Sequence, residues 1–123
     1  MERLHNLLQY HDAQGYVTFT NVNSGKAVDV SGGKVANYSN IQQYNSNGTK
    51  SQKWIVQKSG SGYTIISAMD PNYVLDLSGG RIENNRNIQL YQSNGSTAQQ
   101  WTFEKNMTER ERLDEMATQN KSM

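Results

Sequence analysis

Two sets of polar and aromatic side chains, spaced identically along the chain, are of the types that hold a neutral sugar. Such recognition takes a carboxylate or amide that bonds to adjacent hydroxyls, an aromatic face that stacks on the C–H face of the ring, and turns that leave the rim open. The first set is Asp29, Gln42, Tyr44, Asn47 and Gln52, and the second is Asp76, Gln89, Tyr91, Asn94 and Gln99. Each set predicts one candidate binding site.

The two sets belong to an internal repeat with a period of 47 residues. Residues 15–58 align with residues 62–105 without a gap, and 17 of the 44 positions are identical. Self-similarity at one fixed period indicates a supersecondary unit that occurs twice and packs against its copy. A site in the first unit is therefore expected to have a twin in the second.

Each repeat has the pattern of four short strands joined by tight turns. Runs of β-branched and aromatic residues alternate with segments rich in Gly, Asn and Ser. The expected strands are 16–20, 26–30, 41–44 and 52–57 in the first repeat, and 63–67, 73–77, 88–91 and 99–104 in the second. Four strands in 47 residues, with a turn signal about every 8–12 residues, predict an all-β fold.

Other repeated residues are expected to have structural roles. Trp54 and Trp101 recur in phase with the apolar residues, so both are predicted to lie in the core. The Ser-Gly-Gly segments that end the second strand of each repeat predict turns with unusual φ angles. Gln52 and Gln99 fit internal struts better than direct ligands.

The first residues continue the same frame. The segment 5–11 falls on the register of 52–58, with Leu7 at the position of Trp54. Residues 1–14 are therefore predicted to be the last strand of a truncated preceding repeat. An unrelated N-terminal helix is the alternative.

The strand pattern ends after the second repeat. Thr108 and Glu111 form a capping box, and Leu113, Met116 and Ala117 share one helical face. A short charged helix is therefore predicted over 108–119. The expected organisation is a stub (1–14), two repeats (15–61 and 62–106) and a charged segment (107–123). The charged segment would be either a tail or a linker to a further domain.

Composition excludes several classes of function. The chain has 123 residues, a net charge of +1 and no basic stripe, so a nucleic-acid partner is not expected. No apolar run approaches the roughly 18 residues of a membrane span, so membrane insertion is not expected. The start Met1–Leu4 is followed by no long apolar stretch, so no signal peptide is predicted in this chain.

The sequence contains few residues that could form a catalytic, metal or cofactor site. The chain contains no cysteine, and its two histidines, His5 and His11, lie in the terminal stub. Asp29 and Asp76 fall in separate repeats, which would not place them across one glycosidic bond. We therefore expect neither an enzyme nor a cofactor-dependent protein.

The repeated motifs resemble those of the ricin B-type lectin family. They run Asp-x-Ser-Gly-Gly, Asn-Ile-Gln-x-Tyr, Ser-Asn-Gly and Gln-x-Trp from Asp29 to Trp54, and recur from Asp76 to Trp101. The resemblance covers about 15–105. It implies a β-trefoil, a fold of three such units around a pseudo-threefold axis, with sugars bound in shallow pockets. It also implies a secreted, extracellular protein.

The resemblance implies a role for each candidate residue. Asp29 and Asp76 would bind sugar hydroxyls, and Tyr44 and Tyr91 would be the stacking platforms. Gln52 and Gln99 would orient the two aspartates, Asn47 and Asn94 would add contacts at the rims, and Gln42 and Gln89 would line the same sites. One charged hydrogen bond and one aromatic contact give an affinity on the order of −4 kcal/mol per site, near millimolar, so useful binding would be multivalent.

Three departures from the family pattern stand out. A trefoil has three units, and this chain has two with a stub of another. Ser46 and Ser93 stand where disulfide-bearing members have cysteine, and Ser51 and Ala98 stand where sugar-binding members often have Asn. The open edge that two units leave would be covered by the stub and tail, or by a second chain in a homo-oligomer.

The sequence therefore predicts a carbohydrate-binding module with β-trefoil repeats. The candidate ligands are galactose, N-acetylgalactosamine and xylan-type glycans, and the sequence leaves the choice among them open. The rival hypothesis is a structural or self-association fragment whose sugar pockets are vestigial.

Overall fold

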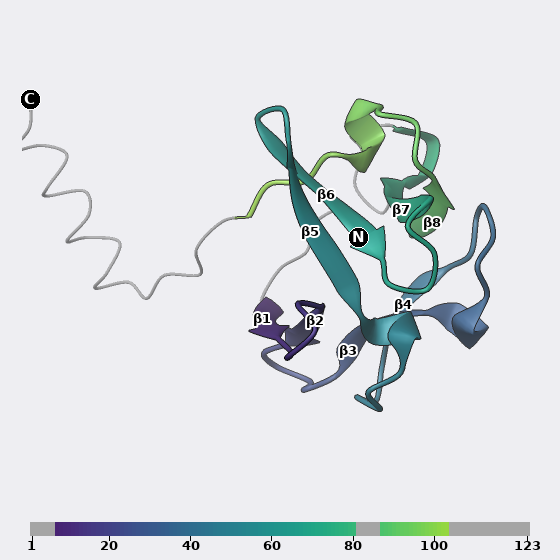
Figure 1. Ribbon diagram of the computed structural model, residues 1–123. Helices are drawn as coiled ribbons and strands as arrows, with labels where there is room; N and C mark the ends of the chain where they lie inside the picture. Colours follow the sequence, from purple (N-terminus) through teal and green to yellow (C-terminus); the bar gives the residue numbers. More distant parts are fainter. Residues whose placement is uncertain (1–6, 81–86, 104–123) are drawn as a thin grey trace, which may run out of the picture.

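Strands make up nearly all the regular structure of this chain, as Figure 1 shows for a computed structural model that describes residues 7–80 and 87–103. The strands are β1 (Leu7–His11), β2 (Val17–Asn21), β3 (Ala27–Val30), β4 (Ile41–Tyr44), β5 (Trp54–Ser59), β6 (Gly62–Ser67), β7 (Tyr73–Leu77) and β8 (Ile88–Gln92). Four 3-10 turns accompany them: η1 (Ser31–Gly33), η2 (Lys50–Gln52), η3 (Ser78–Gly80) and η4 (Thr97–Gln99). The predicted all-β fold is confirmed, and the helix predicted over 108–119 lies outside the described residues.

The strands pair antiparallel in the order β4-β3-β2-β5-β6-β7-β8, and β1 adds to β2. Within each repeat the second and third strands form a hairpin that carries the candidate site, β3 with β4 and β7 with β8. The long β5–β6 hairpin crosses the boundary between the repeats and is paired from Trp54↔Ser67 to Ser59↔Gly62. The two sites are therefore built on equivalent hairpins of one continuous sheet.

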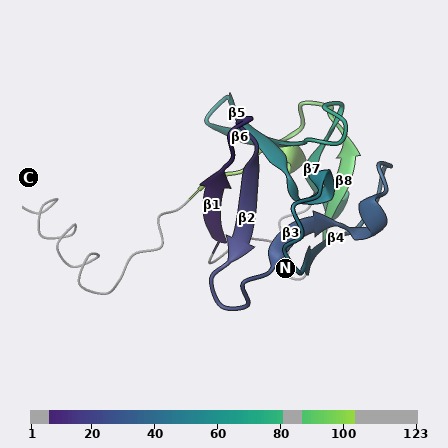
Figure 2. The ribbon, with the colours of Figure 1, turned by 60° about the horizontal axis from the view of Figure 1, so that its bottom comes forward.

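The N-terminal segment of the described chain is a strand. β1 pairs with β2 from Leu7↔Asn21 to His11↔Val17, and Figure 2 shows the two strands side by side. The alternative of an N-terminal helix is therefore wrong for these residues. The assignment of residues 1–14 to a truncated preceding repeat stays a prediction.

The fourth strand of the second repeat, predicted over 99–104, is wrong for the described part of that range. Gln99 ends the 3-10 turn η4, and the next residues make a single bridge, Tyr63↔Trp101. Gln52 likewise ends η2, and β5 begins at Trp54. β5 is a full strand because β6 pairs along its whole length, whereas none of the described strands pairs along the segment at Trp101.

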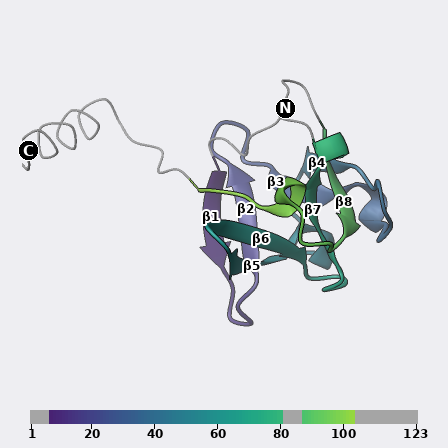
Figure 3. The same cartoon turned by 90° about the horizontal axis from the view of Figure 1, so that it is seen from above.

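The core follows the alternation of apolar residues in the strands. Val17 and Phe19 on β2 are buried while their neighbours are only half-buried, and all four residues of β3 are buried. The predicted core position is confirmed for Trp54, which is completely buried. Trp101 is half-buried and packs against the core without being part of it. The Phe103 ring stacks on Phe19 at 6.0 Å. In Figure 3 the segment after η4 can be followed past β6 towards β1 and β2.

Candidate functional site

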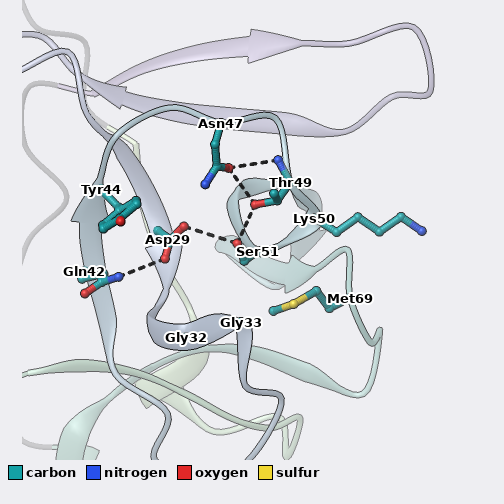
Figure 4. Close-up of a pocket in the computed structure, with 10 residues that line it drawn as sticks. All are labelled: Asp29, Gly32, Gly33, Gln42, Tyr44, Asn47, Thr49, Lys50, Ser51 and Met69. Atoms are coloured by element: carbon teal, nitrogen blue, oxygen red, sulfur yellow. Dashed lines mark hydrogen bonds between the residues drawn. The ribbon is translucent and has the colours of Figure 1, made fainter.

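An open pocket of about 530 Å³ lies beside the β3–β4 hairpin of the first repeat (Figure 4). This volume is within the usual range for small-molecule sites. The residues that line it are Asp29, Gly32, Gly33, Gln42, Tyr44, Asn47, Thr49, Lys50, Ser51 and Met69. Four of the five residues predicted for the first site are therefore brought to one pocket, and the fifth, Gln52, is buried behind it.

Asp29 is the centre of a hydrogen-bond network at the base of this pocket. It is 4% exposed, and its Oδ1 accepts a hydrogen bond from Gln42 Nε2 at 3.1 Å. Its Oδ2 accepts from Gln52 Nε2 at 2.9 Å and from the Ser51 hydroxyl at 3.3 Å. A carboxylate has about four acceptor positions, so three donors hold its orientation and leave capacity for a ligand hydroxyl.

Gln52 connects the carboxylate to the turn that follows β4. Besides Asp29, its Nε2 bonds to the carbonyl oxygen of Asn45 at 2.8 Å, and its Oε1 accepts from the backbone N–H of Asn47 at 3.0 Å. Every polar atom of the buried amide is thus satisfied. The indole of Trp54 adds a bond to the carbonyl oxygen of Val28, directly before the aspartate.

Tyr44 forms the open aromatic wall of the first site. It lies two residues after Gln42 on β4, so the two side chains share one face of the strand. The Tyr44 side chain is 52% exposed, and Figure 4 shows it beside Asp29 at one side of the pocket. An exposed aromatic face beside a fixed carboxylate provides both elements required to bind a sugar ring.

The opposite rim is a chain of small polar groups. Asn47 Oδ1 accepts from the backbone N–H and the hydroxyl of Thr49, and that hydroxyl lies 2.7 Å from the Ser51 hydroxyl. Gly32, in the adjoining turn, has a φ of +66°, a conformation that favours glycine, and a Cβ built on it would meet no atom within 4 Å.

The second repeat reproduces the same network. Asp76, 6% exposed, accepts from Gln89 Nε2 at 3.0 Å and from Gln99 Nε2 at 3.0 Å. Gln99 also bonds to the carbonyl oxygen of Gln92 and to the N–H of Asn94. The third bond to the aspartate has no equivalent, because Ala98 replaces Ser51 and carries no hydroxyl.

The two tyrosine platforms have different surroundings. Tyr91 is half-buried, and Tyr38 from the first repeat meets its ring edge-on, with ring centroids 5.3 Å apart and an interplanar angle of 73°. Hydrogen bonding with the Tyr38 side chain raises the pKa of Tyr91, and the negative charge of Asp76 contributes to the same shift. Tyr38 was not predicted as a site residue, because Asn85 occupies its position in the second repeat.

Three residues that line the pocket were not predicted as site residues. Thr49 and Lys50 come from η2 and the residue before it, and Met69 follows β6 in the second repeat. The internal repeat does not identify these three residues, because none of them is identical to the residue 47 positions away. Those residues are Ser96, Thr97 and Val22, respectively. Within 7–80 and 87–103, no group of three or more His, Cys, Asp or Glu side chains could hold a metal ion.

The sequence of this chain matches a known protein family. A family model described as a ricin-type beta-trefoil lectin domain-like family matches residues 5–91, more than half of the chain. The chain belongs to the ricin-type β-trefoil lectin family. Membership supports a carbohydrate-binding module as its general class, and domains of this family are generally non-catalytic. No curated protein matches the chain.

Solved structures with the same fold include designed and natural proteins. A designed threefold-symmetric protein, ThreeFoil, is 26% identical with a TM-score of 0.74, and the match covers 78% of this chain and 69% of that protein. An exo-β-1,3-galactanase from Clostridium thermocellum is 30% identical with a TM-score of 0.74, covering 78% of this chain and 21% of the enzyme. This member of the ricin-type family thus spans about a fifth of the galactanase.

A natural agglutinin shows the same fold at lower identity. The Rhizoctonia solani agglutinin is 23% identical with a TM-score of 0.71, and the match covers 79% of this chain and 66% of the agglutinin. At this identity the likeness establishes the fold alone. The predicted β-trefoil class is confirmed by these solved structures.

Proposed function

We propose that the chain is a non-catalytic carbohydrate-binding module with one weak site in each repeat. The observation that carries this proposal is the twin network in which a buried glutamine holds an aspartate at the base of each site. In the first site this aspartate lines an open pocket with an exposed tyrosine at its side. A fixed carboxylate beside an exposed aromatic ring suits a neutral sugar better than a charged or wholly apolar ligand.

Galactose-type sugars are the first candidates, followed by N-acetylgalactosamine and xylan-type glycans. The exo-β-1,3-galactanase, 30% identical over the matched region, supports this order. One charged hydrogen bond and one aromatic contact correspond to a dissociation constant near 1 mM per site, about −4 kcal/mol. Two such sites on one chain would bind a polysaccharide more tightly than either binds a single sugar. We place the protein outside the cell, where glycans of this kind occur.

A protein-detected NMR titration with galactose, N-acetylgalactosamine, lactose and xylobiose tests this function. We expect shifts around Tyr44 and Tyr91 that saturate at millimolar sugar. Asp29→Ala should abolish the shifts around Tyr44 and leave those around Tyr91, while Asp76→Ala should do the reverse. Each variant serves as the control for the other. A folded spectrum that none of the four sugars changes would refute the proposal.

A structural or self-association module is the second candidate, and the edge position of β4 favours it. β4 ends the order of the sheet, and among the described strands it pairs with β3 alone. An unpaired strand edge is a template for pairing with another chain. Light scattering over a range of protein concentrations tests the self-association, because a monomer at all concentrations would exclude it.

A further inference from the structure

Tyr38 combines two features that are unusual for a large aromatic residue. Its side chain is 70% exposed, the most exposed large apolar or aromatic side chain in the described part of the protein. Its φ is +70°, and no other non-glycine residue described has a positive φ. A left-handed backbone conformation at a non-glycine residue is strained and persists only when neighbouring structure fixes it, and residues of this kind are enriched at active sites and ligand clamps.

The second repeat supplies the contacts that fix this conformation. The backbone N–H of Tyr38 donates to the Leu90 carbonyl oxygen at 2.9 Å, and the Leu90 N–H donates to the Ser39 carbonyl oxygen at 2.8 Å. The side chain of Asn37 accepts a bond from the N–H of Gln92 at 2.8 Å. The segment 37–40 thus lies along the edge of β8, the strand that carries two of the second site's residues.

This arrangement puts an aromatic ring of the first repeat at the second site. Tyr91 and Gln89 share one face of β8, where Gln89 bonds to Asp76, and the Tyr38 ring meets Tyr91 at 73°. The two rings form a corner, and its Tyr91 side lies on the face of β8 whose Gln89 bonds to the aspartate. No comparable ring contact involving Tyr44 occurs among the described residues, and Tyr44 is more exposed than Tyr91.

We propose that Tyr38 is a binding residue of the second site, where it provides a second aromatic wall for the next ring of a linked saccharide. This proposal rests on the carbohydrate-binding function proposed above. Two linked sugar rings offer two C–H faces, and two tyrosine rings at a large angle offer a surface to each. The first site has the single wall of Tyr44 and takes one sugar residue. The two sites therefore differ in specificity although equivalent glutamines hold both aspartates.

The substitution Tyr38→Asn tests this proposal with little disturbance of the backbone. Asparagine tolerates a left-handed φ, and asparagine is already the residue at the equivalent position 85. Tyr38→Phe is the matched control, because it keeps the ring and removes only the hydroxyl. The amide signals of Leu90 and Gln92 report whether the segment 37–40 stays in place in each variant.

The measurement is a titration of each protein with galactose and with lactose, followed separately around Tyr44 and Tyr91. In the wild type we expect lactose to bind the second site about three- to tenfold more tightly than galactose, and the first site with equal affinity for both. Tyr38→Asn should remove the preference at the second site, while Tyr38→Phe should retain it. Intermolecular NOEs between lactose and the Tyr38 ring in the wild type give a readout that needs no variant.

The outcomes separate this proposal from the general function. If both sugars bind at both sites and Tyr38→Asn leaves the preference for lactose unchanged or tightens binding, Tyr38 is not a wall of the site. Lactose bound at the second site without an NOE to Tyr38 leads to the same conclusion. If no sugar binds the wild type at either site, the carbohydrate-binding function itself fails, and this proposal fails with it.

Discussion

Gln52 and Asp29 are joined by a hydrogen bond of 2.9 Å in which the amide nitrogen donates to carboxylate oxygen Oδ2. Gln52 is 1% exposed, so this bond is shielded from water. The same amide group also bonds to the backbone of Asn45 and Asn47. One buried side chain thus fixes both the carboxylate and the turn at the pocket rim. A site held in this way needs little rearrangement when a ligand binds.

Gln52→Ala is expected to lower the free energy of unfolding by about 3 kcal/mol, because it removes three hydrogen bonds of about 1 kcal/mol each from a buried position. Gln99→Ala should have an effect of similar size, since its bonds are equivalent. Urea denaturation measures both values. Gln57→Ala, at an exposed position of β5, is the control and should leave the midpoint unchanged. Equal midpoints for all three variants would show that these glutamines are not structural.

Trp54→Ala is expected to destabilise the protein by about 3–5 kcal/mol, because it removes a large side chain that is 0% exposed. Trp101→Ala should have a smaller effect, since Trp101 is only half-buried and lies at a single bridge. Thermal unfolding followed by circular dichroism compares the two. A larger loss for Trp101→Ala would mean that the segment near Trp101 contributes more to the core than its burial indicates.

Gly62→Ala is expected to displace the segment at Trp101. A Cβ at this position would lie 2.7 Å from the Trp101 carbonyl oxygen, which is too close for any real contact. We expect a loss of about 1–3 kcal/mol, typical of overpacking, and the disruption of the Tyr63–Trp101 bridge. Hydrogen exchange of the Tyr63 and Trp101 amides measures the bridge directly. Ser61→Ala, at an exposed position in the same turn, should leave both amides as protected as in the wild type.

Tyr91 is expected to titrate at a higher pH than an ordinary tyrosine. Its contact with Tyr38, together with the charge of Asp76, raises its pKa above the usual value of 10.0. A raised folded-state pKa means that the contribution of neutral Tyr91 to stability is complete below pH 10 and is lost as the pH rises through the folded pKa. The pH dependence of the Tyr91 ring signals in NMR spectra follows this ionisation residue by residue, whereas ultraviolet absorbance would sum all seven tyrosines.

The variant Tyr38→Phe distinguishes the cause of this shift. Removal of the Tyr38 hydroxyl should bring the pKa of Tyr91 back towards 10.0, because its partner is lost while the ring remains. The same pH titration in Tyr44→Phe is the control, since Tyr44 has no such neighbour among the described aromatic contacts. An unchanged Tyr91 titration in Tyr38→Phe would assign the shift to burial and to Asp76.

Repetition made much of the polar site predictable. Asp29, Gln42 and Gln52 could be grouped from sequence because each has an identical partner 47 residues later. The structure adds the bond from Gln42 to Asp29, two residues that are opposite each other in the register of β3 and β4. The bond from Gln52 to the Asn45 carbonyl oxygen could not be predicted, since a backbone acceptor carries no side-chain signal.

Contacts that break the repeat were not predictable in this way. Tyr38 lies far from Tyr91 in the sequence, and the repeat has Asn85 at the equivalent position. The strand expected over 99–104 failed for a different reason. Its sequence suits a strand as well as that of β5 does, but a strand needs a partner along its length, and local sequence does not supply one.

The placement of segment 37–40 on β8 makes part of the first repeat a component of the second repeat's site. Asn37 and Tyr38 belong to the first repeat, but their hydrogen bonds are made with β8 of the second repeat. A change at Tyr38 would therefore alter the surroundings of Tyr91 in the other repeat, and the two repeats are not independent structural units. In a permuted protein with the second copy first, Asn85 would precede the strand that carries Tyr44. The order of the two repeats therefore decides which site gains a neighbouring aromatic ring from the other repeat.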